Sequence, residues 1–263
     1  MAMPQPNSNV ASRLALSVVI PAYNEEERIG PTLLSIDRYL KEQPYAYEII
    51  VVDDGSSDST VRVVQELSTQ VRQLKLLQQR GNQGKGWAVR AGMLSALGRY
   101  RLFMDADGST DIAHWDALRS ELDAGSDVVV GSRHVAGSRI DVHQSQFREL
   151  LGGVFRHLVR MTFGLPIHDT QNGFKAFTSE AALRIFTRQK VTGWAFDVDV
   201  LSIAQRLGYS MLEVPVTWID DDRSRMTMRA MPRMLMDLMR IRLNAVPTPT
   251  YRAIPQLRPL FAE

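Results

Sequence analysis

The chain has 263 residues, and its content of 44% hydrophobic and 23% charged residues is that of an ordinary globular protein with one large α/β domain. It contains no cysteine, which excludes disulfide bonds and thiolate metal sites and fits a reducing compartment. The formal net charge is only +2, but arginines gather in one late segment and predict a local basic face there: Arg223, Arg225, Arg229, Arg233, Arg240 and Arg242.

The distribution of apolar residues excludes further classes. The apolar run at residues 14–20 is too short for a signal peptide and leads directly into polar turn residues. No uninterrupted run of about 18 apolar residues occurs, so we expect no transmembrane helix. The basic segment has no interleaved aromatic surface for reading bases, so we expect no nucleic-acid partner. A cytoplasmic location follows from these expectations.

Strand-and-helix units follow one another through the first half of the chain. Residues 1–13 are small, polar and proline-containing, and predict a flexible arm. Apolar runs then end in polar turns that lead into helical patterns: "LALSVVI" into "PAYNEEE", "YEIIVVDD" into "GSSDST", "LKLLQQ" into "RGNQGKG", and "YRLFMDADG" into a helix at residues 112–122. Strands that alternate with helices predict a mostly parallel sheet covered on both faces, with ligands at the carboxyl ends of the strands.

The second half is less regular. The strand "DVVVGSR" is followed by a helix that ends near residue 163, the segment "DTQNGFKAFT", another helix, the segment "WAFDVDV" and a late strand "MLEVPVTWI". We interpret these as an appendage to one catalytic domain at residues 14–225. A basic amphipathic helix is predicted at residues 226–246, and the proline-containing residues 247–263 predict a loose tail.

The pair Asp105 and Asp107, after the buried run "YRLFM", is the main candidate for chemistry. Aspartates that follow a strand are often only helix caps, and Asp111 can serve that purpose here. Phosphatase-type hydrolases of the haloacid dehalogenase class also use D-x-D-G-[ST], but they usually open with it and need later carboxylates where this chain has "VVVGSR". The third possibility is a pair of oxygen ligands that hold Mg²⁺ or Mn²⁺ against a nucleotide diphosphate.

The loop "GNQGKG" superficially resembles a phosphate-binding loop. It lacks the Walker spacing and the Ser or Thr after the lysine, and no G-x-G-x-x-G follows the first strand, so neither a P-loop nor a dinucleotide site is indicated. Gly84 and Gly86 nevertheless allow close backbone approach, and Lys85 supplies positive charge for a nucleotide or its phosphates.

The ordered motifs "VVIPAYNEEERI", "IIVVDDGSSDST", "NQGKGWAVRAG" and "MDADGSTD" resemble glycosyltransferase family 2, whose members share the GT-A fold. "VVVGSRH", "DTQNGFKAFT" and "WAFDVDVLSIAQRLGYSMLEVPVTW" resemble more narrowly the dolichyl-phosphate glucosyltransferase and mannosyltransferase group. The likeness implies a Rossmann-like GT-A sheet and an inverting enzyme that moves a sugar from a nucleotide-sugar donor onto a polyprenyl phosphate.

The donor sugar is predicted from one departure within the metal motif. Mannosyltransferases of the group often read D-A-D-L-[QS], whereas Gly108 and Ser109 follow the aspartates here, which resembles the glucose branch and favours UDP-glucose. The alternatives are GDP-mannose as donor, or the same fold acting on a soluble acceptor. A catalytically silent nucleotide-sugar-binding protein is disfavoured by the intact Asp105 and Asp107.

The resemblance and the strand-end positions together assign the nucleotide side. Asp107 is the expected principal ligand of a Mg²⁺ or Mn²⁺ ion, with Asp105 nearer the ribose or a metal-bound water. Tyr23 can offer a flat face to the base, and Asp53 or Asp54 can accept a hydrogen bond from an imide N–H of the base. The full nucleotide-binding set is Pro21, Ala22, Tyr23, Glu25, Asp53, Asp54, Gly84, Lys85, Asp105 and Ala106.

Arginines after the fifth strand form the expected acceptor side. A phosphate oxygen is already anionic near neutral pH, so cationic residues that orient it matter more than a general base. We expect Arg133 and Arg139 to hold the acceptor phosphate, with Arg148 as a third candidate.

Three further candidates come from the later motifs by resemblance. Asp169 and Gln171 are candidates for donor or acceptor contacts, and Asp197 is counted among the catalytic residues. Asp197 and Asp199 lie two positions apart, so on a helix they cannot share one face and we expect only one of them at the site.

The predicted amphipathic helix at residues 226–246 is assigned to the membrane surface, since the acceptor is a lipid and no span is expected. Packing of this helix on the core, or against a second copy in a homodimer, is the alternative. The protein is therefore expected to be peripheral on the cytoplasmic face of a membrane. The predicted apolar face is Met231, Met234, Leu235, Leu238, Ile241 and Leu243.

Overall fold

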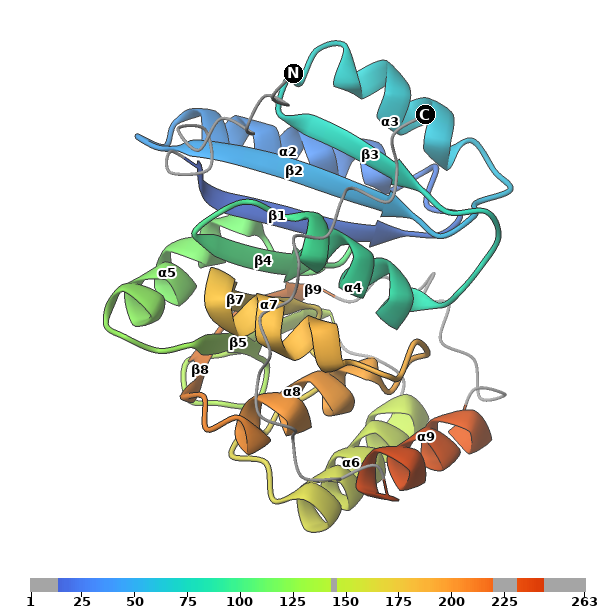
Figure 1. The fold of residues 1–263 in the computed structure, drawn as a ribbon, viewed down its shortest axis with the longest axis vertical. Helices are drawn as coiled ribbons and strands as arrows, with labels where there is room; N and C mark the ends of the chain where they lie inside the picture. The colour runs from blue at the N-terminus through green and yellow to red at the C-terminus, as the bar shows by residue number, and fades with distance from the viewer. Residues whose placement is uncertain (1–13, 143–145, 220–230, 244–263) are drawn as a thin grey trace, which may run out of the picture.

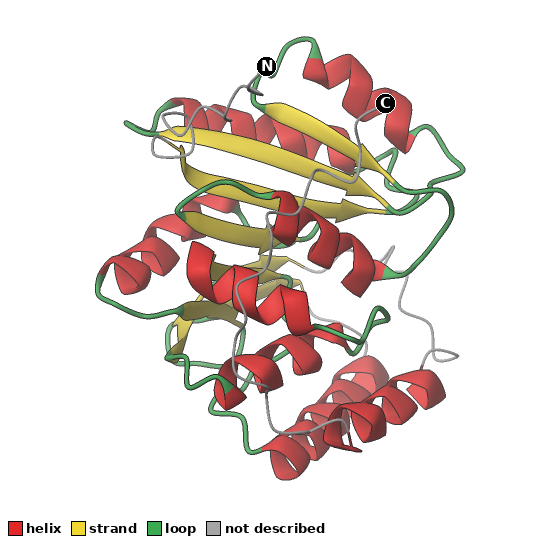
Figure 2. Ribbon diagram, in the orientation of Figure 1, coloured by secondary structure: helices red, strands yellow, loops and turns green. Residues whose placement is uncertain are grey.

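The computed structural model describes residues 14–142, 146–219 and 231–243 (Figure 1). A seven-stranded sheet runs through the centre, and helices cover both of its faces (Figure 2). The mostly parallel α/β architecture predicted from the sequence is therefore confirmed.

The first half of the chain forms the predicted strand-and-helix units. Each apolar run becomes a parallel strand, and β1 continues through Pro21 and Ala22 of the predicted turn. The elements are β1 (Leu14–Ala22), α2 (Ile29–Lys41), β2 (Ala46–Asp53), α3 (Thr60–Ser68), β3 (Leu74–Gln78), α4 (Lys85–Ser95) and β4 (Tyr100–Met104).

The second half contains the less regular elements. The predicted helix at residues 112–122 is divided into a short 3-10 turn and an α-helix, because Asp111 caps the turn through the N–H of Ala113. The elements are η1 (Ile112–His114), α5 (Trp115–Asp123), β5 (Val128–Ser132), β6 (Arg139–Val142), α6 (Gln146–Phe163), β7 (Phe174–Thr178), α7 (Ser179–Arg188), α8 (Phe196–Arg206), β8 (Met211–Pro215), β9 (Thr217–Ile219) and α9 (Met231–Leu243).

The order of strands brings distant parts of the sequence to one edge. The central sheet has the order β3-β2-β1-β4-β7-β5-β8, and β7 is antiparallel to both of its neighbours, β4 and β5. The amino end of β7 therefore lies beside the carboxyl ends of β4 and β5. This reversal carries the segment "DTQNG", just before β7, to the edge where the other polar motifs gather. The strands β6 and β9 pair separately in a two-stranded sheet.

Two apolar clusters, one on each face, stabilise the sheet. On one face the helices α2, α3 and α5 pack on residues such as Val18 and Phe174. On the other face α4, α6, α7, α8 and α9 pack around Val19, Phe103 and Phe196. Because both faces are covered, the strands read as nearly continuous apolar runs.

The described part of helix α9 packs on the protein. Its described residues 231–243 lie within the predicted range 226–246, and the arginines at residues 223–229 lie outside the described residues. Met234, Leu238 and Ile241 are buried with the α6 and α8 side of the core, whereas Leu235 and Leu243 are exposed. The predicted apolar face is thus divided between a core contact and an exposed strip.

The flexible arm and the tail predicted at residues 1–13 and 247–263 lie outside the described residues. Within the described parts, no helix combines the length and the apolar character that crossing a membrane requires.

Candidate active site

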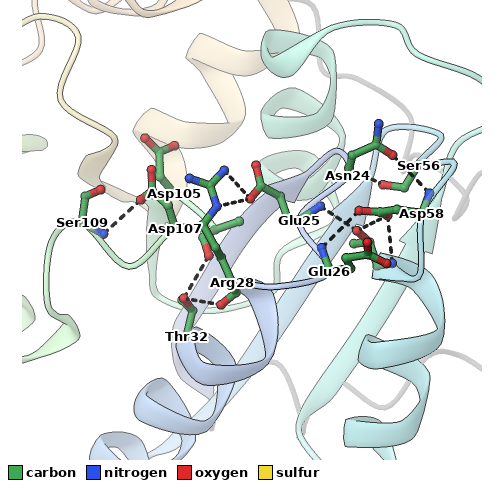
Figure 3. Close-up of polar contacts among 12 residues, drawn as sticks. Asn24, Glu25, Glu26, Arg28, Thr32, Ser56, Asp58, Asp105, Asp107 and Ser109 are labelled. Carbon is green, nitrogen blue, oxygen red and sulfur yellow. Dashed lines mark hydrogen bonds and ion pairs between the residues drawn. The ribbon is translucent and has the colours of Figure 1, made fainter. Parts of the chain in front are cut away.

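Side-chain hydrogen bonds tie together the turns that follow β1 and β2 (Figure 3). Asn24 adopts a left-handed φ of 55°, which asparagine tolerates better than most residues, and its Oδ1 accepts the N–H of Ser57 at 2.7 Å. The N–H of Glu25 donates to Thr60 Oγ1 at 2.7 Å. The two turns therefore form one rigid unit, beside which Tyr23 keeps 38% of its surface exposed and available to a planar ligand.

Asp53 and Asp54 shape the loops at the end of β2. Asp53 accepts the N–H of Ser56 at 3.2 Å, and Asp54 accepts the N–H groups of Gln83 and Gly84 at 2.8 Å each. Burial raises the pKa of Asp54, although the two N–H groups act against that rise. Both carboxylates are buried and already hydrogen-bonded, so their predicted contact with a base stays a prediction.

The glycines of "GKG" are required by contacts within the protein. Gly84 has a φ of 104°, and a Cβ there would lie 2.5 Å from the carbonyl oxygen of Thr192. A Cβ at Gly86 would lie 2.4 Å from the Cβ of Phe196. The two glycines lie against the loop before α8 and against Phe196 at its start, and the predicted close approach of a nucleotide stays a prediction.

Lys85 forms an ion pair with the first aspartate of the metal motif. Its Nζ lies 2.7 Å from Asp105 Oδ1 and also over the rings of Trp194 and Phe103. Burial acts to lower the pKa of Lys85, but the carboxylates of Asp105 and Asp197 outweigh it, so that the pKa is raised and the ammonium stays charged. Burial also raises the pKa of Asp105, against the opposing effect of Lys85. The ionisation states of Lys85 and Asp105 therefore depend on each other.

The two aspartates leave β4 in a backbone that neighbouring segments hold. The N–H of Asp105 donates to the carbonyl of Gly173 at 3.0 Å, and a Cβ at Gly173 would collide with the Asp105 carboxylate. Asp107 Oδ1 accepts the N–H of Ser109 at 3.0 Å, within a turn where Gly108 has a φ of 68° (Figure 3). A glycine in each segment thus lets the two carboxylates sit at the edge of the sheet.

The other predicted nucleotide contacts lie around this turn. Pro21 and Ala22 end β1, and Ala106 is buried between the two aspartates. Glu25 is paired with Arg28, whose Nε lies 2.7 Å from the carboxylate. An acidic residue predicted to face the nucleotide is therefore neutralised by a cation that the sequence interpretation did not single out.

The carboxylate oxygens at this edge fit a hard divalent cation that is also coordinated by substrate phosphates. Among the described residues no group of three or more His, Cys, Asp or Glu side chains could hold a metal by itself. Asp105 and Asp107 offer carboxylate oxygens, the type that Mg²⁺ and Mn²⁺ prefer, and Mg²⁺ is usually bound by one or two carboxylates together with substrate phosphates. The residues present are therefore suited to a metal–diphosphate complex.

Arg133 and Asp169 form a buried ion pair on the opposite side of the aspartates. Nε and Nη2 of Arg133 lie 2.8 Å from the two Asp169 oxygens, and the guanidinium lies over the ring of Trp218. Burial opposes ionisation of Asp169, but the hydrogen bonds and charge of Arg133 prevail and lower its pKa to about 2. Glu213 holds this loop by accepting the N–H groups of His168 and Asp169. A fixed cation therefore follows β5.

The other predicted acceptor residues are less closely placed. Arg139 begins β6 and is exposed, with its N–H donated to the carbonyl of Val216. Arg148 lies in α6, but its side chain is outside the described residues. Gln171 is partly buried in the segment before β7. Their predicted contacts with the acceptor or donor stay predictions.

A second buried ion pair lies behind the segment before β7. Lys175 in β7 is 1% exposed, and its Nζ donates to Asp197 Oδ1 at 2.6 Å and to the carbonyl of Asn172. Burial raises the pKa of Asp197, against the charge of Lys175. Asp199 instead accepts N–H groups of the loop before α8, including that of Val191 at 2.9 Å. The two α8 aspartates therefore bind different partners, and the predicted role of Asp197 at the site stays a prediction.

Several residues of this edge were missed by the sequence interpretation, namely Arg28, Asn172, Lys175, Glu213 and Trp218. One usable signal was a lysine inside the otherwise apolar strand "FKAF", because a lysine buried on a sheet needs a charged partner. The partner lies 22 residues away and could not be identified from the pattern alone.

The amino-acid sequence is similar to that of known proteins in one family. Residues 17–186 match the family described as glycosyl transferase family 2. The dolichyl-phosphate beta-glucosyltransferase of Drosophila melanogaster is 41% identical over 241 residues, covering 84% of this chain and 72% of the relative. The enzyme of the same name from Dictyostelium discoideum is 37% identical over 256 residues, covering 90% of this chain and 77% of its own.

A solved structure shares the fold at lower sequence identity. The glucosyl-3-phosphoglycerate synthase of Mycobacterium tuberculosis, in complex with Mn²⁺, UDP-glucose and phosphoglyceric acid, superposes with a TM-score of 0.64. The two chains are 18% identical, and the match covers 91% of this chain and 84% of the synthase.

Proposed function

The chain belongs to glycosyl transferase family 2 and has its GT-A fold, and on that basis we propose that it transfers glucose from UDP-glucose to a polyprenyl phosphate. The observation that carries the proposal is the edge of the sheet on which Asp105 and Asp107 lie between the nucleotide-side turns and the Arg133–Asp169 pair. The names of the Drosophila and Dictyostelium relatives support glucose as the sugar and a lipid phosphate as the acceptor.

The donor nucleotide occupies the side of the edge above β1 and β2. The hydrogen-bonded turns present Tyr23 for stacking on the uracil ring, while Asp53 and Asp54 lie below as acceptors for its imide N–H. Lys85 neutralises Asp105 in the absence of donor and is available to the negative charge of the diphosphate. This side therefore binds and orients UDP without taking part in bond formation.

Asp105 and Asp107 would hold a Mg²⁺ or Mn²⁺ ion on the diphosphate. When bound, such an ion supplies positive charge that stabilises the UDP leaving group. The chain itself contributes the rigid β4 turn and the Gly173 carbonyl that fix Asp105. The Mn²⁺ complex of the mycobacterial synthase, which has the same fold, supports a divalent metal.

The acceptor phosphate approaches from the side of Arg133. One of its oxygens attacks the anomeric carbon of glucose, the bond from that carbon to the UDP oxygen breaks, and a single displacement inverts the anomeric centre to give a β-linked product. The attacking oxygen is already anionic, so no side chain has to remove a proton. Arg133, held flat by Asp169 and Trp218, and the exposed Arg139 supply charge to orient it.

A lipid acceptor requires contact with a membrane, which we assign to the exposed apolar strip of α9 and α6. On α9 this strip consists of Leu235, Met236, Met239 and Leu243, and Met161 is exposed on α6, against which α9 packs. The exposed Arg242 can reach anionic headgroups from the end of α9. The lack of cysteine fits the reducing cytoplasmic face of that membrane, which is part of the proposal.

A screen of donors against acceptors tests the proposal. UDP-glucose and GDP-mannose are each incubated with Mg²⁺ or Mn²⁺ and either a short polyprenyl phosphate or 3-phosphoglycerate. We expect glucose transfer to the polyprenyl phosphate and none to 3-phosphoglycerate. Transfer to 3-phosphoglycerate alone would favour a soluble acceptor, as in the mycobacterial synthase. Transfer of mannose would show that GDP-mannose, and not UDP-glucose, is the donor.

A further inference from the structure

Asn172 is a buried polar side chain whose amide has no partner among the described residues. The residue is 2% exposed, and both its Oδ1 and Nδ2 atoms are buried without a hydrogen bond. The hydroxyl of Thr170, two residues earlier, is in the same state. Leaving one such group unpaired costs about 1–3 kcal/mol, so two groups within three residues require an explanation.

Asn172 lies beside the reacting positions of the proposed site. Asn172 lines a small pocket together with Asp105, Ser109, Thr110, Gly173 and Trp218. Asp105 belongs to the metal motif, and the guanidinium of Arg133 lies over the ring of Trp218. The pocket therefore lies between the donor diphosphate and the acceptor phosphate, where the transferred sugar has to be.

The backbone around Asn172 is fixed by hydrogen bonds to two successive carbonyls. The carbonyl of Asn172 accepts a hydrogen bond from the ammonium of Lys175, which Asp197 anchors from behind. The next carbonyl, of Gly173, accepts the N–H of Asp105. Contacts on both sides thus hold the residue at the edge while its amide stays unpaired.

We propose that the Asn172 amide binds a hydroxyl group of the transferred hexose and contributes to the choice of sugar. This inference rests on the proposed function. A carboxamide offers a donor and an acceptor together, which matches a hydroxyl, whereas a phosphate oxygen can use only the donor. The nucleobase is not the partner, because Tyr23, Asp53 and Asp54 lie above β1 and β2, on the other side of Asp105 in the sheet order. A site that hydrogen-bonds a hydroxyl also rejects a sugar that lacks or misplaces it.

Calorimetry with UDP and with UDP-glucose separates this role from others. In Asn172→Ala we expect the affinity for UDP to be unchanged and that for UDP-glucose to fall by roughly tenfold or more, as loss of a buried hydrogen bond implies. Asn172→Leu, of similar size and without polar atoms, should do the same. The midpoint of thermal unfolding should stay level or rise in both, since each removes an unpaired buried amide.

Ser202→Ala is the matched control, because the Ser202 hydroxyl in α8 is also buried without a partner among the described residues but does not line the pocket. It should leave both affinities unchanged. If the Asn172 variants unfold at lower temperature and keep wild-type affinity for UDP-glucose, the amide is structural and the inference falls. Equal losses of affinity for UDP and for UDP-glucose would also overturn the inference, because Asn172 would then contact the nucleotide and not the sugar.

The proposed function fails separately, in the wild-type protein. If the wild type binds GDP-mannose instead of UDP-glucose, the donor assignment is wrong, and the same variants are compared on GDP and GDP-mannose. A selective loss for the sugar nucleotide would still support the role of Asn172, and equal losses would still exclude it.

Discussion

The two sides of the site edge are built from different interactions. Above β1 and β2, on the turn side, neutral N–H groups and side-chain oxygens bind each other, as in the contacts of Asn24 and Thr60. Around β5 and β7, on the ion-pair side, buried charges meet in the pairs Arg133–Asp169 and Lys175–Asp197. On the turn side the buried carboxylates of Asp53 and Asp54 are held by backbone N–H groups, whereas the ion-pair side keeps cations fixed where a sugar and an anionic acceptor are expected.

The largest effect is expected where the two sides meet. Asp107→Asn should lower glucose transfer by about a hundredfold to a thousandfold, because the proposed metal no longer has its principal carboxylate. A chelator should abolish transfer by the wild type, and added Mg²⁺ or Mn²⁺ should restore it. Steady-state rates with UDP-glucose and polyprenyl phosphate measure both.

The matched control for this change is Asp111→Asn. Asp111 lies in the same loop but only caps the turn η1, so its loss should leave the transfer rate near that of the wild type. Normal turnover by Asp107→Asn, or full activity of the wild type in chelator, would contradict the proposal that transfer needs a metal held by this aspartate.

The ion-pair side can be broken at Lys175. Lys175→Met leaves the buried carboxylate of Asp197 without its partner and should lower the free energy of unfolding by about 3–5 kcal/mol. Adding Asp197→Leu should recover much of that loss, because both charges are then gone. Urea unfolding of the single and double variants measures the difference.

Arg62→Met provides the surface comparison. Arg62 pairs with Glu66 on α3 with both side chains well exposed, and its loss should cost less than about 1 kcal/mol. If Lys175→Met were as mild as Arg62→Met, the buried pair would not stabilise the segment that carries Asn172.

The pH dependence of stability should have opposite signs at Asp169 and at Asp54. The lowered pKa of Asp169 stabilises the folded protein above its unfolded pKa of about 3.9, and this contribution of about 2 kcal/mol is lost as the pH falls through about 2. The raised pKa of Asp54 acts in reverse: its contribution is present at low pH and is lost as the pH rises through its folded value.

Unfolding free energies of the wild type, Asp169→Asn and Asp54→Asn across acidic pH test these signs. The advantage of the wild type over Asp169→Asn should grow as the pH rises, and its advantage over Asp54→Asn should shrink. The same sign for both variants would contradict the opposite pKa shifts of Asp169 and Asp54.

The smallest effect is expected at the membrane strip of α9 and α6. Met236→Ser and Met239→Ser together should reduce flotation with anionic liposomes by several-fold, since each exposed methionine contributes about 1 kcal/mol when buried in lipid. Leu34→Ser, which removes an exposed apolar side chain from α2, should leave flotation unchanged. Equal behaviour of the two variants would exclude the strip as the membrane contact.

The sequence predicts the turn side well and the ion-pair side poorly. "PAYNEEE" and "DDGSSDST" span the ends of their strands, so local patterns place Tyr23 and Asp54 at the edge. The direction of β7 is set by its pairing with β4 and β5, which are distant in sequence, and no local pattern carries that information. The contacts of Lys175 and the position of Asn172 depend on this reversal, so they could not be predicted.

Analysis of the product tests the central claim most directly. The wild type is given equal amounts of UDP-glucose and GDP-mannose with Mg²⁺ and a short polyprenyl phosphate, and the sugar and its anomeric coupling are read by NMR from the isolated lipid. We predict a β-linked glucosyl polyprenyl phosphate, formed by single displacement on the donor. A mannosyl lipid would contradict the donor, and an α-linked product would contradict the direct attack of the phosphate held on the Arg133 side.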